Sequence, residues 1–125
     1  MRDDHLFGIA RKKSYAELRR DFRWDLPKTF NFGTDVVDAW AAERDGLALV
    51  WENASGDQAA YHFSDIARLS NRLASALSTA GVRKGDRVVI MLPRIPEWQI
   101  AMVACLKVGA VAIPCIEMLT ARDMD

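Results

Sequence analysis

The stretch from Arg87 to Ile113 limits the possible folds more than any other part of the sequence. It begins with a continuous apolar run over residues 88–92, which is typical of a strand buried on both faces in a parallel sheet. A second apolar run, Ala110 to Ile113, is closed by Pro114. The residues between the two runs predict a helix from Pro96 to Val108. The stretch therefore predicts two parallel strands joined by a crossover helix, with a right-handed connection.

Both ends of this predicted helix carry residues that helix ends favour. Pro96 suits the first helical position because its missing N–H would have no partner inside the helix. Glu97 and Lys107 lie beside the positive and negative ends of the helix dipole. Gly109 suits the left-handed conformation that ends many helices. Because only Glu97, Gln99 and Lys107 are polar, we expect other parts of the protein to cover most of this helix.

Composition narrows the class of protein. The 125 residues, 50% hydrophobic and 27% charged, are ordinary for a globular domain. Seventeen basic and seventeen acidic residues cancel, so the bulk charge does not favour binding to nucleic acid or to an anionic membrane. The first residues lack a secretory signal and no apolar run approaches the ~20 residues of a membrane span, so we expect a cytoplasmic protein. Cys105 and Cys115 have no paired spacing and are interpreted as reduced thiols.

The sequence divides into residues 1–46, an N-terminal region, and residues 47–125, the main α/β portion. The first thirteen residues indicate a solvated tail with a small basic cluster at residues 11–13. Ser14 and Glu17 have the spacing of a capping box, which predicts a short helix after Ser14.

Two further features are expected before residue 47. The aromatic-rich segment from Trp24 to Phe32 has no period, and we expect an extended strap that presses Trp24, Phe30 and Phe32 onto the domain surface. Thr34 is expected to cap a helix over residues 35–44.

A hairpin and an amphipathic helix are predicted next. Residues 47–52 alternate with period two, a turn-forming segment follows, and residues 58–63 return as the second strand. Ser64 is expected to cap a helix whose inner stripe is Ile66, Leu69, Leu73 and Leu77. Gly81 should end this helix and place Val82 back on Leu77 in a Schellman motif.

No residue of this sequence stands out as catalytic, cofactor-binding or metal-binding. The glycines match neither a dinucleotide fingerprint nor a phosphate-binding loop. His5 lies in the expected tail, and His62 lies on a predicted strand without the base and orienting partner that catalysis needs. Asp35 and Asp38 are explained by the dipole of the helix on which they lie.

Four segments together closely resemble the start of AMP-forming acyl-CoA synthetases, in register over about four-fifths of the chain. The segments are FNFGTDVVDAW at Phe30 to Trp40, YHFSDIARLSNRLASAL at Tyr61 to Leu77, GVRKGDRVVIMLPRIPEW at Gly81 to Trp98 and KVGAVAIP at Lys107 to Pro114. The Gly-Val-x-x-Gly-Asp-Arg-Val turn and the Lys-x-Gly-Ala-Val segment are shared widely by adenylate-forming enzymes. The Phe-Asn-Phe segment at residues 30–32 and the Leu-Pro-Arg-Ile-Pro-Glu-Trp segment at residues 92–98 are more similar to the medium-chain branch.

The resemblance implies a partial N-terminal domain of the acyl-CoA synthetase-like fold. Such enzymes activate a fatty acid with ATP and magnesium to an acyl-adenylate and transfer the acyl group to coenzyme A. The phosphate-binding loop, the adenine and ribose contacts and the catalytic lysine follow the matched region in the family, so no catalytic residue is carried over. ATP, magnesium and coenzyme A are therefore implied for the parent enzyme and not for this chain.

Three hypotheses remain, and the length of the open reading frame distinguishes them. The chain is an inactive fragment of an acyl-CoA synthetase, a short natural interaction module, or an independent nucleotide-binding α/β domain. As a fragment it should expose an unpaired strand edge and an apolar patch, and we expect it to form homo-oligomers through that surface. Two copies could meet either by pairing of their edge strands or by packing of the helix over residues 98–108.

Overall fold

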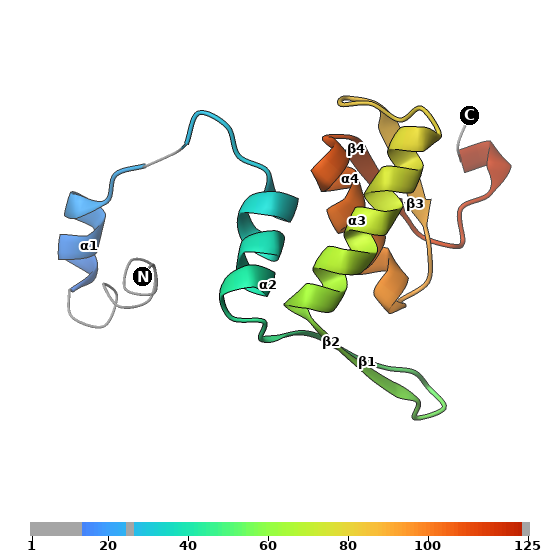
Figure 1. Cartoon of the computed structure of the whole chain (residues 1–125), viewed down its shortest axis with the longest axis horizontal. Coiled ribbons are helices and arrows are strands. Elements are labelled where there is room, and N and C mark those ends of the chain that lie inside the picture. Colours follow the sequence, from blue (N-terminus) through green and yellow to red (C-terminus); the bar gives the residue numbers. More distant parts are fainter. Residues whose placement is uncertain (1–13, 25–26, 124–125) are drawn as a thin grey trace.

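The computed structural model describes residues 14–24 and 27–123, which form short helices, a hairpin and a strand–helix–strand unit (Figure 1). The basic cluster at residues 11–13, His5 and Met124 lie outside the described residues. In chain order the elements are α1 (Tyr15–Asp21), the π-helix η2 (Gly33–Asp38), α2 (Ala39–Glu43), β1 (Leu47–Glu52), β2 (Gln58–His62), α3 (Phe63–Thr79), β3 (Arg87–Met91), α4 (Pro96–Val108), β4 (Val111–Cys115) and the 3-10 helix η3 (Ala121–Asp123).

The predicted strand–helix–strand unit is confirmed. Strands β3 and β4 are parallel, with Arg87 opposite Val111 and Met91 opposite Cys115, and α4 connects them. The helix has Pro96 in its first turn and ends at Gly109, whose φ of 77° is left-handed, as expected. The expectation that Pro114 closes the second strand is wrong, because Pro114 lies inside β4 opposite Ile90. Proline is tolerated there because β4 pairs on one side only and is an edge strand.

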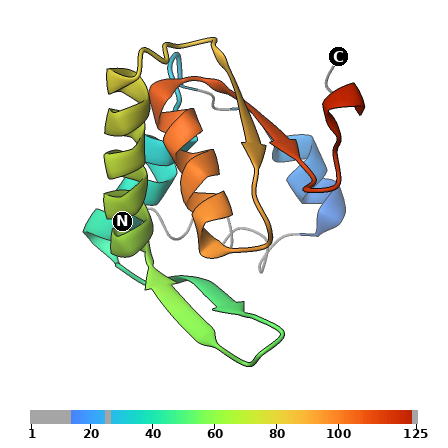
Figure 2. The same ribbon diagram turned by 90° about the vertical axis from the view of Figure 1, so that its right-hand side faces the viewer.

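The parallel sheet is covered on one face. Ile90 is buried against α4 with Cys105 and Ala110, and α4 lies between the sheet and α3 (Figure 2). On the other face Val89 is 53% exposed and its cross-strand neighbour Ile113 is 36% exposed. The expectation that both faces are buried is therefore wrong for this chain, because only one layer of helices covers a two-stranded sheet. The expectation of an unpaired strand edge and an exposed apolar patch is confirmed.

The hairpin and the inner face of α3 agree with the sequence pattern. Strands β1 and β2 are antiparallel and extend beyond the helices (Figures 1 and 2). On α3, Ile66 is buried and Leu69, Leu73 and Leu77 pack against the two apolar clusters. The Schellman motif is confirmed by two bonds, from Val82 N–H to the Leu77 carbonyl and from Gly81 N–H to the Ser78 carbonyl.

The predicted start of α3 is two residues late, because the N-cap was expected at Ser64. The helix begins at Phe63 and its N-cap is His62, whose backbone N–H donates to Asp65 at 3.2 Å. Ser64 does not cap the helix, because its N–H and its hydroxyl both donate to the carboxylate of Asp45. Asp45 has a left-handed φ of 42°, which turns the chain from α2 toward β1 and brings its carboxylate to the start of α3.

The N-terminal region departs furthest from expectation. The capping box of Ser14 and Glu17 is confirmed, but α1 buries no residue and lies apart from the other helices (Figure 1). The predicted strap is wrong, because Trp24 is 78% exposed and Phe30 and Phe32 are exposed as well. Aperiodic aromatic residues carry no local signal of what would cover them. The ring of Trp24 instead contacts Phe22 edge-to-face at 5.0 Å.

The helix predicted to begin after Thr34 begins earlier and in another form. It starts as the π-helix η2 at Gly33 and becomes α-helical only at Ala39. Thr34 makes no capping bond into the helix, since its hydroxyl donates to the carbonyl of Asn31. Asn31 takes the predicted role, because its side-chain oxygen accepts the N–H of Gly33 at 2.9 Å.

Candidate functional site

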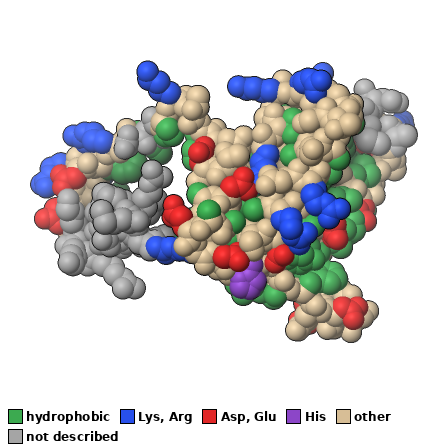
Figure 3. All heavy atoms as spheres, viewed as in Figure 1, with side chains coloured by type: hydrophobic (Ala, Val, Ile, Leu, Met, Phe, Trp, Pro, Cys, Tyr) green, Lys and Arg blue, Asp and Glu red, His purple; other side chains and the backbone are tan. Residues whose placement is uncertain are grey.

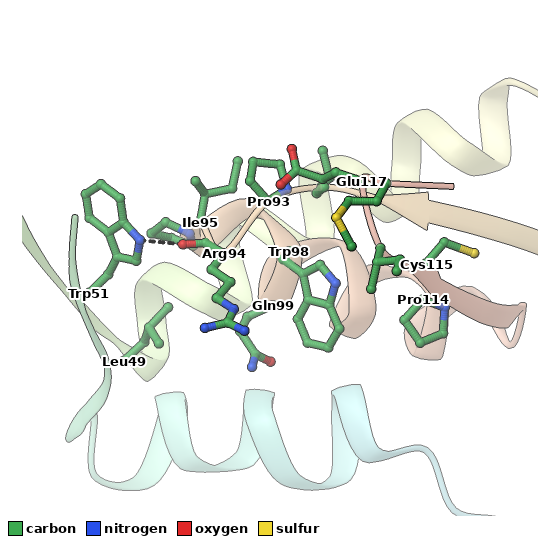
Figure 4. Close-up of a pocket in the computed structure, with 14 residues that line it drawn as sticks. Leu49, Trp51, Pro93, Arg94, Ile95, Trp98, Gln99, Pro114, Cys115 and Glu117 are labelled. Carbon is green, nitrogen blue, oxygen red and sulfur yellow. Dashed lines mark hydrogen bonds between the residues drawn. The ribbon is translucent and has the colours of Figure 1, made fainter. Parts of the chain in front are cut away.

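A hollow at the carboxyl ends of β3 and β4 is named here the strand-end pocket (Figure 4). Its volume is about 620 Å³, within the range of small-molecule sites. Its lining comes from β1, from the loop between β3 and α4, from the start of α4, and from the end of β4 and the chain after it. The lining residues are Leu49, Trp51, Leu92, Pro93, Arg94, Ile95, Pro96, Trp98, Gln99, Pro114, Cys115, Ile116, Glu117 and Met118.

A single hydrogen bond ties the hairpin to the loop after β3. The Trp51 indole N–H donates to the Arg94 carbonyl at 2.7 Å, as the dashed line in Figure 4 shows. Trp51 and Arg94 are 43 residues apart in the sequence. The bond therefore makes β1 one wall of the strand-end pocket and holds the loop that carries Arg94 and Ile95.

Three side chains in this otherwise apolar lining are charged or carry an amide: Arg94, Gln99 and Glu117. In Figure 4 the Arg94 guanidinium and the Gln99 amide extend to one side, and the Glu117 carboxylate lies at the opposite side. Cys115 also lines the pocket, whereas Cys105 is buried inside the apolar cluster. Burial raises the pKa of the Cys105 thiol, which makes it an inert core residue and not a nucleophile.

Away from the strand-end pocket, a cluster of polar side chains joins η2, α3 and α4 and is named the lysine junction. The Lys107 ammonium donates to Asp38 of η2 at 2.5 Å and to Asn71 of α3 at 2.7 Å. The side chain of Lys107 is only 5% exposed and that of Asp38 is 33% exposed. Asn31 completes the junction by donating to the Leu106 carbonyl at 2.7 Å. This arrangement has the features of a structural tie, because the Lys107 ammonium donates to three protein oxygens, those of Asp38, Asn71 and the Ala67 carbonyl.

Gly33 lets the junction form. A Cβ atom on Gly33 would overlap the Cγ atom of Lys107, so only glycine lets the η2 backbone approach the lysine stem this closely. From the sequence, Lys107 and Asp38 are each explained by a helix dipole. The structure shows that they pair with each other across 69 residues.

The other residues considered from sequence have structural surroundings. His62 is exposed, and its Nδ1 atom lies 2.8 Å from the Asp45 carbonyl. Hydrogen bonds from Ser64 hold the pKa of Asp45 below its ordinary value, and the His62 backbone N–H does the same for the pKa of Asp65. Within residues 14–24 and 27–123, no three His, Cys, Asp or Glu side chains are grouped so that they could hold a metal ion.

The pocket residues could have been suspected from one sequence signal. Ligands of open α/β sheets bind in the crevice outside the carboxyl ends of parallel strands. Residues 93–95 and 114–118 directly follow the two predicted parallel strands. Trp51 could not have been suspected in this way, because nothing in a hairpin strand indicates which distant loop it will contact.

The profile of the family described as AMP-binding enzyme matches residues 37–125. The chain belongs to the AMP-binding enzyme family. The structure and this match confirm both the α/β fold and the resemblance to AMP-forming acyl-CoA synthetases.

Named relatives agree with this assignment. The chain is 39% identical over 118 residues to acyl-coenzyme A synthetase ACSM3, mitochondrial, of Pongo abelii, covering 89% of this chain and 20% of that protein. It is 42% identical over 130 residues to acyl-coenzyme A synthetase ACSM4, mitochondrial, of Mus musculus, covering 98% of this chain and 22% of that protein.

A solved structure shares the fold. The acetoacetyl-CoA synthetase of Streptomyces lividans superposes with a TM-score of 0.69 and 31% identity, over 80% of this chain and 16% of that one. The chain spans about a fifth of the length of the two acyl-coenzyme A synthetases described above.

Proposed function

We propose that this chain is the N-terminal part of an acyl-CoA synthetase of the medium-chain branch. The parent enzyme activates a fatty acid with ATP and magnesium to acyl-AMP and then transfers the acyl group to coenzyme A. The observation that carries the proposal is the 39% identity over 118 residues to a protein named acyl-coenzyme A synthetase. The Leu-Pro-Arg-Ile-Pro-Glu-Trp segment at residues 92–98 supports the medium-chain branch.

The role of this chain in that reaction is to provide scaffold. Stabilising a transferring phosphoryl or adenylyl group takes a phosphate cradle and a cation. The sequence has no phosphate-binding loop, and Lys107 is held by Asp38 and Asn71 in the lysine junction. The residues present do not fit ATP or magnesium, and no step of the reaction is assigned to them.

The purified 125-residue chain should therefore form no acyl-adenylate. The measurement is ATP–pyrophosphate exchange dependent on octanoate, with a full-length acyl-CoA synthetase as the positive control. Exchange above background by the chain alone would overturn the scaffold assignment. A full-length protein that carries this sequence and shows no exchange with any medium-chain acid would overturn the proposed parent activity.

An alternative function is a stand-alone α/β interaction module without catalysis. The bare face of the parallel sheet supports it, because Val89, Val111 and Ile113 are exposed side by side there. We propose a second copy of this chain as the occupant, since a net charge of zero places no long-range repulsion between copies. A symmetric dimer is the commonest closed arrangement for such a contact.

The cellular compartment stays a prediction. The sequence led us to expect the cytoplasm, whereas both relatives described above carry the word mitochondrial in their names. In the described part of the chain, no helix combines the length and apolarity needed to cross a membrane. Fractionation of cells that express the intact gene would decide between the two compartments.

A further inference from the structure

The hydrogen-bond ladder between β3 and β4 determines which backbone groups of the parallel sheet are left open. The Val111 N–H donates to the Asp86 carbonyl at 2.8 Å, which fixes the alternation of the ladder. In a parallel pair every second residue of a strand bonds to the neighbouring strand. Val88 and Ile90 therefore bond to β4, and the other residues of β3 turn their backbone groups away from it.

Three residues, Arg87, Val89 and Met91, form what is named here the free edge of β3. Across residues 14–24 and 27–123, no protein group bonds to the backbone N–H or carbonyl groups of these three residues. Their side chains share the bare face of the sheet, because alternate residues of a strand point to the same face. Arg87 and Val89 are exposed and Met91 is half-buried. The free edge therefore offers a full set of backbone donors and acceptors beside apolar surface.

The outer edge of β4 is less suited to pairing. The same alternation turns the backbone groups of Ala112 and Pro114 away from β3. Pro114 has no N–H to donate, and proline on an edge strand is a common protection against pairing with another chain. Within the parallel sheet, a further strand is therefore expected at β3 and not at β4.

We propose that a second copy of this chain pairs with the free edge of β3 through its own β3, antiparallel, with Val89 opposite Val89 of the second copy. The choice of a second copy rests on the interaction module proposed above, whereas the account of the free edge does not. The contact is the same on both copies, so a two-fold axis closes it. The two parallel sheets would then form one continuous sheet.

Centring the pair on Val89 is the register that uses the whole free edge. Arg87 of one copy then lies opposite Met91 of the other, and every outward N–H and carbonyl of the edge gains a partner. Centring on Arg87 would place two guanidinium groups opposite each other, which is destabilising. Centring on Met91 would place Val89 opposite Pro93, which has no N–H to donate. The Val89 register avoids both conflicts.

Amide hydrogen exchange followed by NMR tests the free edge on the 125-residue chain itself. The Arg87, Val89 and Met91 amides should exchange about tenfold more slowly in a sample that is about nine-tenths paired than in dilute monomer. The Val88 and Ile90 amides bond to β4 and should already be slow in the monomer. Protection that does not rise with concentration, or that rises without alternating along β3, would overturn the proposal.

Two substitutions at Met91 test the register by charge. Met91→Glu places a carboxylate opposite Arg87 of the second copy and should tighten the dimer about fivefold, whereas Met91→Lys places a like charge there and should weaken it about fivefold. Both variants put a charge at the same half-buried position, so an effect common to both on folding cancels in the comparison.

Val50→Glu is the matched control, because Val50 is exposed on the hairpin and lies outside the parallel sheet. It should leave the dimer dissociation constant, measured by sedimentation equilibrium, unchanged. Equal constants for the two Met91 variants, or an effect of Val50→Glu as large as theirs, would overturn the proposal.

These results are separable from the proposed functions. A dimer whose β3 amides show no alternating protection would keep the interaction module and remove the pairing at the free edge. A monomer at every concentration would remove both, and it would leave octanoate-dependent pyrophosphate exchange by a full-length protein unaffected.

Discussion

Lys107 of α4 links its own helix to η2 and to α3. Its ammonium bonds to Asp38 and Asn71, and its stem passes over Gly33. Buried ion pairs contribute little net stability compared with apolar replacements, but removing one partner leaves the other uncompensated. The lysine junction should therefore respond far more to a single substitution than to a matched double one.

Lys107→Met should lower the free energy of unfolding by about 2 kcal/mol, because Asp38 and Asn71 lose their donor. Adding Asp38→Leu should recover part of that loss, since no carboxylate is then left unpaired. Urea denaturation of the single and double variants measures both effects. Lys84→Met, at an exposed turn, is the control and should stay within about 0.5 kcal/mol of the parent protein. A double variant less stable than the single one would show that the pair is not a unit.

At the scale of elements, the start of α3 depends on a carboxylate outside the helix. Asp45 accepts the Ser64 N–H at 2.8 Å and the Ser64 hydroxyl at 2.9 Å, and these bonds hold the pKa of Asp45 below its ordinary value of 3.8. A carboxylate whose pKa is lowered by folding stabilises the folded state above its unfolded pKa. That stabilisation is lost as the pH falls through the folded pKa.

Asp45→Asn should therefore make the stability of the protein less dependent on pH below about pH 4. Asparagine is chosen because it tolerates the left-handed φ of position 45. Thermal unfolding followed by circular dichroism between pH 2 and pH 7 measures the effect. Glu43→Gln, at an exposed position of α2, should leave the acid dependence unchanged. Identical acid profiles for Asp45→Asn and the parent protein would mean that the Ser64 bonds do not contribute.

Elements with local signals were predictable from the sequence. Helix α4 has its proline and glycine at the ends, and the Schellman motif at Gly81 involves residues that are neighbours in the chain. The prediction of an extended strap was wrong because the spacing of Trp24, Phe30 and Phe32 has no helix or strand period that would indicate a covering surface. The lysine junction and the contact of Trp51 with Arg94 join residues 69 and 43 positions apart, and a single sequence holds no signal for such pairs.

At the scale of the whole molecule, the exposed sheet face is the dominant feature. Val89 and Ile113 are opposite each other on β3 and β4, and both strands pair on one side only. The formal net charge is zero, so no net charge repels another copy. Figure 3 shows both signs of charge on the face of the molecule that carries α3. Unpaired edges beside apolar surface are the usual cause of self-association.

Light scattering over a dilution series should show the chain forming dimers or larger species as its concentration rises. Val89→Glu should shift this equilibrium toward monomer, because it places a charge at the centre of the bare face. Val50→Glu is the matched control, since Val50 is 65% exposed on the hairpin and lies outside the parallel sheet. A monodisperse monomer at every concentration, with no binding of an apolar dye, would contradict the proposed dimer.

The separation of Lys107 and Asp38 also has a kinetic consequence. The hairpin β1–β2, the Schellman motif after α3 and the β3–α4–β4 unit each join residues that are near one another in the sequence. The bond between Lys107 and Asp38 instead closes a loop of 69 residues. Long closures carry a larger entropic cost and are made after local contacts. Docking of η2 onto α4 is then a late event in folding, and breaking it is an early event in unfolding. The lysine junction would set how long the folded chain persists and leave the speed of folding almost unaffected.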